Sequence, residues 1–215
     1  MVRKLPKASI CLVFLFSMSV CATEKVASNW LVEGLIDWRT HEFDGTTDYS
    51  LTDHSGSKVV RAKARNSASS LYRNIKVDIN QTPIINWSWM ASYFKGDGLE
   101  TTKAGDDFVV RLYVVASTGP MPWQKSSLVY VISRDEPVGS YWPNPFTQRA
   151  IIYVVDTYDS VRGRWVNHKA DIKKDFKRYF NKDIDIIDGI ALMTDTDNSG
   201  GEAVAYYGDI YFSED

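Results

Sequence analysis

The most specific chemical spacing in the chain is the acidic segment at residues 195–200, which reads DTDNSG. Oxygen-bearing side chains at alternate positions, followed by glycine, are typical of the first half of a calcium-binding loop. An EF-hand would need Glu at position 206, where this chain has Tyr206, so the pattern excludes an EF-hand. Two interpretations remain. Asp195 and Asp197 are ligands of a structural calcium in a β-loop, or the segment is a tight turn, which the same residue types favour.

A second acidic point, Asp106 and Asp107, directly precedes the most apolar stretch of the chain, residues 108–115. Arg111 is the only charged residue in that stretch. A buried arginine without a partner is costly. We therefore expect an internal ion pair between Arg111 and Asp106, Asp107 or Asp195, rather than an anion-binding site.

Carboxylates also offer catalytic chemistry. Asp106 or Asp107, together with Asp195 or Asp197, could form the acid/base pair that glycosidases use. The sequence has no other catalytic signature: it lacks a glycine-rich phosphate loop, a G-x-S-x-G elbow and a C-x-x-C pair, and its three histidines are far apart.

Three aromatic residues in turn-rich segments, Trp123, Tyr141 and Trp142, are the candidates for ligand binding. Core aromatics usually lie on regular strands, whereas exposed tryptophan and tyrosine rings can stack on sugars. The alternative is that these three rings pack under long loops as a satellite of the core.

The elements that must position these residues are mostly strands. Residues 84–92, for example, alternate with period two and place Ile85, Trp87 and Trp89 on one face. Residues 108–115 are apolar on both faces, which indicates a central strand of a sheet covered on each side. The expected strands are residues 58–64, 68–77, 84–92, 108–115, 128–132, 150–155, 186–193 and 203–212.

One helix is expected from Asp171 to Phe180. Asp171 is a favourable N-cap residue, and Ile172 and Phe176 fall on one stripe at helical spacing, opposite a solvated basic face. Many short strands and one late helix predict an all-β fold: an antiparallel β-sandwich with one short α-helix, forming a single domain at residues 28–215.

Residues 1–22 are typical of a secretory signal peptide. Arg3, Lys4 and Lys7 precede an uncharged apolar run that is too short to cross a bilayer as a helix. Small residues predict cleavage after Ala22, and therefore a periplasmic or secreted protein. The alternative is a lipoprotein anchored through Cys21.

Removal of this segment takes away three of the 25 basic residues and none of the 27 acidic ones, which leaves a formal charge of −5. Both cysteines, Cys11 and Cys21, are lost with it, so the mature domain has no internal disulfide. We expect no nucleic-acid partner, because that would call for a strongly basic surface, and no transmembrane segment. Oligomeric state is left open.

Five motifs together resemble one known family. They occur in order at residues 67–73 (SASSLYR), 103–108 (KAGDDF), 144–147 (NPFT), 193–198 (MTDTDN) and 205–210 (AYYGDI). From about Trp38 to Phe212, the chain resembles the uncharacterised bacterial family called domain of unknown function 3047. The resemblance implies an exported β-rich domain and no established reaction.

The last expected strand is similar to the last strand of jelly-roll carbohydrate-binding modules. This resemblance implies a jelly-roll, galactose-binding-like sandwich, and it implies that Asp209 joins Asp195 and Asp197 in holding a structural calcium. Three functions follow as expectations: an exported non-catalytic envelope or extracellular module with a glycan ligand, a polysaccharide hydrolase or lyase that uses the Asp cluster, or a structural envelope protein.

Overall fold

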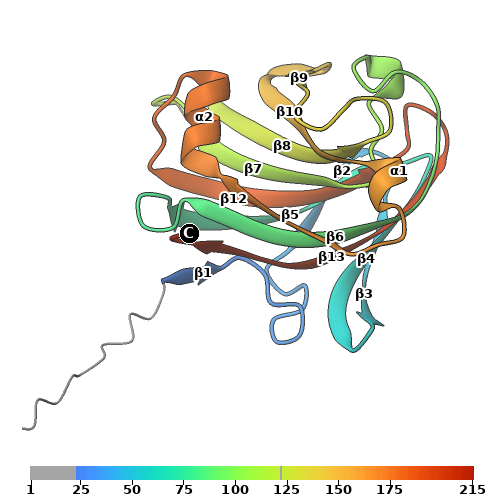
Figure 1. The fold of residues 1–215 in the computed structure, drawn as a ribbon, viewed down its shortest axis with the longest axis horizontal. Helices are drawn as coiled ribbons and strands as arrows, with labels where there is room; N and C mark the ends of the chain where they lie inside the picture. The colour runs from blue at the N-terminus through green and yellow to red at the C-terminus, as the bar shows by residue number, and fades with distance from the viewer. Residues whose placement is uncertain (1–22, 122) are drawn as a thin grey trace, which may run out of the picture.

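The computed structural model describes residues 23–121 and 123–215, and the expected signal peptide, its cleavage site and Cys21 lie outside them. Within the described residues, two β-sheets face one another (Figure 1). In chain order the strands are β1 (Glu24–Val26), β2 (Arg39–Asp44), β3 (Asp48–His54), β4 (Ser57–Arg65), β5 (Ala68–Asp78), β6 (Ile84–Lys95), β7 (Arg111–Ser117), β8 (Lys125–Ser133), β9 (Tyr141–Asn144), β10 (Thr147–Thr157), β11 (Val166–Asp171), β12 (Ile186–Asp195) and β13 (Glu202–Ser213).

The six-stranded sheet has the order β11-β6-β13-β4-β3, and β1 also pairs with β13. The seven-stranded sheet has the order β2-β5-β12-β7-β8-β10-β9. Successive strands often lie in different sheets, so the chain crosses repeatedly from one layer to the other. This arrangement confirms the expected all-β sandwich fold.

One strand pair departs from the expected antiparallel arrangement. β10 runs parallel to β8, with Ile152 opposite Val129, and antiparallel to β9. Parallel neighbours cannot be joined by a tight hairpin. Here β9 is the returning segment, and β10 then inserts between β8 and β9.

The main core lies between the two sheets. Trp87 and Trp89 of β6 are buried there, as their alternation predicts, together with Leu112 of β7 and Tyr130 of β8. Alternate residues of β8 point the other way: Val129 and Val131 belong to a second apolar cluster on the opposite face of the seven-stranded sheet. This sheet is therefore covered on both faces at β8, whereas Tyr113 of β7 is only partly buried on that second face.

The second cluster also explains why β7 begins three residues later than the sequence predicts. Phe108 is buried in that cluster, and its carbonyl accepts a hydrogen bond from the backbone N–H of Asp195 at 3.2 Å. Phe108 therefore packs in the second cluster while Val109 and Val110 are buried in the main core, and regular pairing starts only at Arg111.

The expected helix is α2 (Ile172–Phe180), capped by Asp171, whose carboxylate accepts from the backbone N–H of Lys174 at 3.0 Å. Ile172 and Phe176 are buried in the main core. The tyrosine at position 179 contacts rings of β9 and β10. α2 thus follows the edge strand β11 of one sheet and packs on the edge of the other. Two short helical segments were not expected: α1 (Tyr158–Val161) and the 3-10 turn η1 (Lys103–Gly105).

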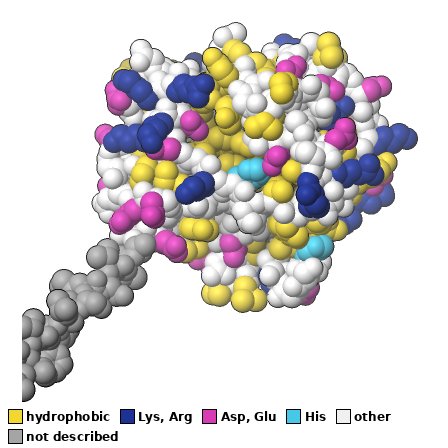
Figure 2. Space-filling view, viewed as in Figure 1, with side chains coloured by type: hydrophobic (Ala, Val, Ile, Leu, Met, Phe, Trp, Pro, Cys, Tyr) yellow, Lys and Arg dark blue, Asp and Glu magenta, His cyan; other side chains and the backbone are white. Residues whose placement is uncertain are grey.

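The folded part begins earlier than the expected domain start at Ser28, because β1 pairs with β13 from Glu24 onward. No helix in the described part of the chain is long and apolar enough to span a membrane. On the face shown in Figure 2, basic and acidic side chains are interspersed, without a continuous basic surface.

Candidate functional site

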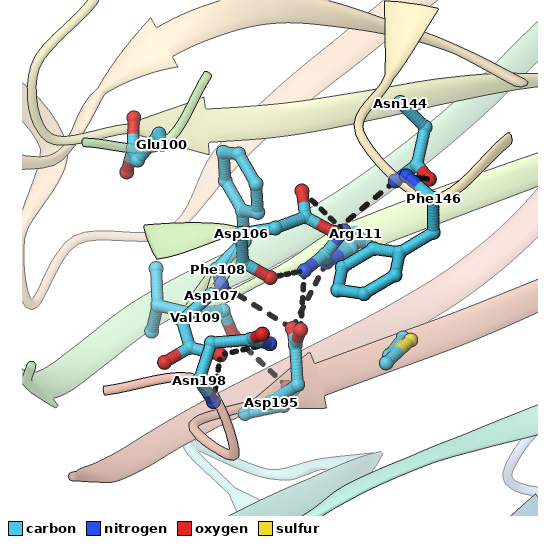
Figure 3. A network of polar contacts seen from close by, with 12 residues as sticks. Glu100, Asp106, Asp107, Phe108, Val109, Arg111, Asn144, Phe146, Asp195 and Asn198 are labelled. Carbon is cyan, nitrogen blue, oxygen red and sulfur yellow. Dashed lines mark hydrogen bonds and ion pairs between the residues drawn. The ribbon is translucent and has the colours of Figure 1, made fainter. Parts of the chain in front are cut away.

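Arg111, the first residue of β7, is the centre of a buried polar network at one end of the seven-stranded sheet (Figure 3). Its side chain is 1% exposed, as is that of Asp195 at the end of β12. Arg111 Nε donates to Asp195 Oδ1 at 2.9 Å, and its terminal nitrogens contact Asp195 Oδ2 and, at 3.3 Å, both carboxylate oxygens of Asp106. Two carboxylates from segments far apart in sequence therefore share one guanidinium.

Three neighbours fix this network. The guanidinium lies over the ring of Phe108, with its central carbon 4.4 Å from the ring centroid. The backbone N–H of Phe108 donates to Asp195 Oδ1 at 3.2 Å. Asn144, at the end of β9, donates from Nδ2 to Asp106 Oδ2 at 3.1 Å. The network thus ties together β7, β9, β12 and the segment before β7.

Asp107 does not join Arg111, contrary to the expectation that it was a partner in the ion pair. It is adjacent to Asp106 and its side chain points to the β12–β13 connection. There it accepts from the backbone N–H of Asn198 at 3.1 Å and of Ser199 at 2.7 Å. The carboxylate thus closes the acidic turn, which joins the two sheets instead of forming a hairpin within one of them.

The candidate cation site consists of Asp107, Asp195 and Asp197, each of which places an oxygen within 4.8 Å of the others. Asp209, expected in this set by resemblance, is absent from it: its Oδ1 accepts from the backbone N–H of Trp30 at 2.8 Å. Asp107 and Asp195 already accept hydrogen bonds, whereas Asp197 Oδ1 is buried and has no hydrogen-bond donor among residues 23–121 and 123–215.

Burial dominates the electrostatics of three of the acidic side chains, Asp195, Asp106 and Asp197. It raises the pKa of Asp195 to about 8, although Arg111 acts in the opposite direction. Burial likewise raises the pKa of Asp106 against the attraction of Arg111. The pKa of Asp197 is raised by burial and by the neighbouring charge of Asp107. These three shifts favour the protonated form of each carboxylate, and at neutral pH Asp195 holds its proton.

The network forms the end wall of a pocket of about 390 Å³ on the open face of the seven-stranded sheet. Tyr113 and Met193 lie on its floor, and the Tyr113 hydroxyl is 3.7 Å from the Met193 sulfur. Phe43 of β2 and Phe146 of the β9–β10 turn also line it, and these rings are 62% and 56% exposed. Pockets of about 300–1,000 Å³ are typical of small-ligand sites.

A second hollow of about 270 Å³ continues along the same sheet face. Its floor includes Val115 and Ala191, which lie two residues along β7 and β12 from the floor residues of the first pocket. Side chains two apart on a strand share a face. We call the two hollows together the groove. Asp188 lines its second part and accepts from Ser117 Oγ at 2.5 Å and from Lys76.

The three aromatic residues expected to bind a ligand do not form one surface. Tyr141 and Trp142 are consecutive on β9 and point to opposite sides: Tyr141 contacts Tyr179 of α2, whereas Trp142 packs on Phe108. Trp123 is 64% exposed in the β7–β8 connection, two residues before Lys125, which lines the groove.

Sequence reasoning missed Phe43 and Phe146 as candidate ligand contacts. Phe43 shares a face of β2 with His41, which is two residues before it. The sequence pattern does not predict this strand, because it is exposed along its whole length. Phe146 lies between Pro145 and Thr147 in a turn, and an aromatic residue at such a position is a signal that could have been used. Their position across the groove from one another depends on the topology.

Comparison with known proteins agrees with this fold. A family model described as "Protein of unknown function (DUF3047)" matches residues 36–211. No curated protein matches the sequence.

Among solved structures, the family 11 carbohydrate-binding module from Clostridium thermocellum, in complex with a β-1,3-1,4-mixed-linked tetrasaccharide, has a TM-score of 0.52. The two chains are 11% identical, and the match covers 90% of this chain and 96% of the module. The family 11 module of the Clostridium thermocellum cellulase Lic26A-Cel5E has a TM-score of 0.49 at 10% identity, covering 89% and 95%. A cellulase derived from Rhodothermus marinus Cel12A has a TM-score of 0.45 at 10% identity, covering 90% and 100%. At this identity the first comparison establishes a shared jelly-roll sandwich fold.

Proposed function

The chain belongs to the DUF3047 family of proteins of unknown function, and from this premise we propose that it is an exported, non-catalytic module that binds a glycan in the groove. The observation that carries the proposal is the pair of exposed rings, Phe43 and Phe146, at the pocket beside a polar end wall. A pyranose has an apolar face of C–H groups and a rim of hydroxyls, so it suits a site with both kinds of surface.

The polar end wall provides defined hydrogen-bonding positions. Asn144 and Asn198 line the pocket, and each already donates to a buried carboxylate, which holds its side chain in place. A preorganised amide gives orientation at a low entropic cost on binding. The fold supports the same class of ligand by analogy, since a carbohydrate-binding module is built on it.

Binding without hydrolysis is favoured by the state of two carboxylates in the groove, Asp195 and Asp188. Both oxygens of Asp195 accept hydrogen bonds from Arg111, and the side chain is 1% exposed. At Asp188, burial opposes ionisation, but Lys76 and Ser117 outweigh it and lower the pKa. A glycosidase needs an acid that reaches the leaving oxygen and a second carboxylate across the scissile bond, and neither of these groups meets that need.

The alternative proposal is a polysaccharide hydrolase or lyase. Its support is the pKa of Asp195 near 8, since a general acid must hold its proton at neutral pH. A third proposal, a structural role in the envelope, requires no ligand in the groove. All three include export, through signal cleavage after Ala22 or through a lipid on Cys21.

The test is isothermal titration calorimetry of the mature protein with each of four saccharides: the mixed-linked β-1,3-1,4 tetrasaccharide, cellotetraose, xylotetraose and chitotetraose. We expect one of them to bind, and Phe43→Ala and Phe146→Ala to weaken that binding by at least tenfold, about 1.4 kcal/mol. Trp123→Ala tests the end of the groove. Tyr93→Ala, which removes an exposed ring outside the groove, is the matched control and should bind normally.

Each outcome decides between the proposals. Release of reducing ends during the titration would favour the hydrolase, and unsaturated products would favour the lyase. Unchanged affinity in both Phe43→Ala and Phe146→Ala would contradict the groove as the binding site. Absence of binding to every saccharide up to millimolar concentration would favour the structural role.

A further inference from the structure

A separate hollow of about 530 Å³ lies on the outer face of the six-stranded sheet, away from the groove. Its lining includes Trp165 from the segment between α1 and β11, His54 from the end of β3, and Ser88 from β6. None of these residues belongs to the polar network around Arg111. The hollow is therefore a second site to be explained.

One wall of the hollow is an aromatic stack assembled from three elements. The ring of His54 lies between Trp165, with centroids 5.6 Å apart, and Tyr206 of β13, at 5.3 Å. Trp165 and His54 are both only partly buried. The stack holds the indole in place while leaving part of its surface open to the hollow.

The floor carries polar side chains that the described part of the chain leaves free. Ser88 and Asn167 are opposite one another in the β6–β11 pair, and the described residues provide no hydrogen-bond partner for either side chain. Asp209 also lines the hollow and is anchored at one oxygen by the backbone N–H of Trp30. Hydroxyl, amide and carboxylate groups thus point toward one space.

A glycine keeps this floor open. A Cβ on Gly208 would fall 2.1 Å from Ser88 Oγ, so any larger residue would displace the serine hydroxyl. The register of β13 against β6 shifts between Tyr207 and Ile210, next to this glycine. The strand irregularity and the missing side chain together shape the hollow.

We propose that this hollow is a second saccharide-binding site, with a sugar ring stacked on Trp165 and its hydroxyls hydrogen-bonded to Ser88, Asn167 and Asp209. The charges that line the hollow include one cation, Lys58, and one carboxylate, Asp209, which fits a neutral sugar better than an ionic ligand. The inference extends the proposed function: two sites on opposite sheets allow one module to engage two glycan chains at once.

The test is an NMR titration of the isotope-labelled mature protein with the same four neutral tetrasaccharides at up to millimolar concentration. The Trp165 indole and the Asn167 side-chain amide report on the hollow, and the Tyr113 ring and Met193 methyl report on the groove. We expect saturable shifts at the hollow that persist in Phe43→Ala. Asn167→Ala, which removes no hydrogen bond within the described residues, should weaken this binding about tenfold, and Trp165→Ala should weaken it further.

Shifts confined to the groove reporters would overturn the second site and leave the proposed function standing. Shifts confined to the hollow reporters would support the second site and overturn the proposal that the groove binds a glycan. No shift at either set of reporters, with every saccharide, would overturn both. Tyr93→Ala serves again as the control for loss of an exposed ring, and it should leave both sets of shifts unchanged.

Discussion

Arg111 and Asp195 are 84 residues apart in the chain, yet Arg111 Nε donates to Asp195 Oδ1 at 2.9 Å, and both side chains are almost fully buried. Met193, two residues before Asp195, lies opposite Arg111 in the β12–β7 register. This pair joins the start of one central strand to the end of its neighbour. It also forms the end wall of the groove, so the stability of the fold and the shape of the candidate site depend on the same contact.

Loss of the Arg111 guanidinium should strongly destabilise the fold. Arg111→Met leaves Asp195 and Asp106 buried without their cation, and breaking a buried pair costs about 3–5 kcal/mol. We expect urea unfolding at pH 8.5, where most of Asp195 is ionised, to show a loss of this size. Arg65→Met is the matched control, because Arg65 is exposed and its contact with Glu202 is a surface ion pair that should contribute little. Equal losses in the two variants would contradict a structural role for the network.

The network should make stability depend on pH in a defined direction. Burial raises the pKa of Asp195 from 3.8 to about 8. Between these values the native state holds a proton that the unfolded state has released, so stability falls as pH rises through this window. Asp106 acts with the same sign. We expect urea unfolding of the wild type to show higher stability at pH 5 than at pH 8.5.

The matching variant is Asp195→Asn, which cannot titrate and should show a smaller decline between pH 5 and pH 8.5, whatever its absolute stability. Carboxyl-carbon NMR of the wild type gives an independent readout. A titration of Asp195 near pH 4 would show that Arg111 outweighs burial and that the expected slope does not exist.

Calcium provides a separate test of the acidic turn. Asp107 accepts backbone hydrogen bonds from Asn198 and Ser199, and Asp195 accepts from Arg111. These contacts already stabilise two of the three clustered carboxylates, so they leave little for a cation to contribute. We therefore expect the melting temperatures with calcium and with chelator to coincide. A stabilisation by calcium, roughly 2.7 kcal/mol at a hundredfold excess over the Kd, that Asp197→Asn abolishes would establish the metal interpretation instead.

The cap of α2 should have a small, local effect. Asp171→Ala removes the acceptor for the backbone N–H of Lys174, and loss of such a cap typically costs about 1 kcal/mol. Asp159→Ala is the control, because Asp159 is in the first turn of α1 but is not its cap residue. Urea unfolding of both variants checks the difference, and an unchanged stability in Asp171→Ala would show that the helix is held by packing alone.

Export is tested by the mature N-terminus. Cleavage after Ala22 leaves a chain that starts at Thr23, one residue before β1 begins to pair with β13. We expect the intact mass of the protein recovered from the periplasm or medium to correspond to residues 23–215. A lipid-modified Cys21 would establish the lipoprotein alternative, and an uncleaved chain would contradict both.

The sequence by itself determined the features that depend on near neighbours. Period-two alternation predicted the strand that carries Trp87 and Trp89, because a half-buried strand exposes every second residue. The helix from Asp171 to Phe180 was predicted from its N-cap residue and from apolar residues at helical spacing, and both signals act within a few residues. The strand β2 was missed for the same reason: exposed along its length, it has no alternation to detect.

Only the tertiary structure decided which distant residues meet. The apolar stretch around Arg111 showed that it needs a carboxylate, but three were available. The register of β7 against β12 selected Asp195, while the loop before β7 supplied Asp106. The groove ring Phe146 is placed by β10, which inserts parallel to β8. These choices depend on strand order and register, which link segments tens of residues apart and leave no mark in a local sequence pattern.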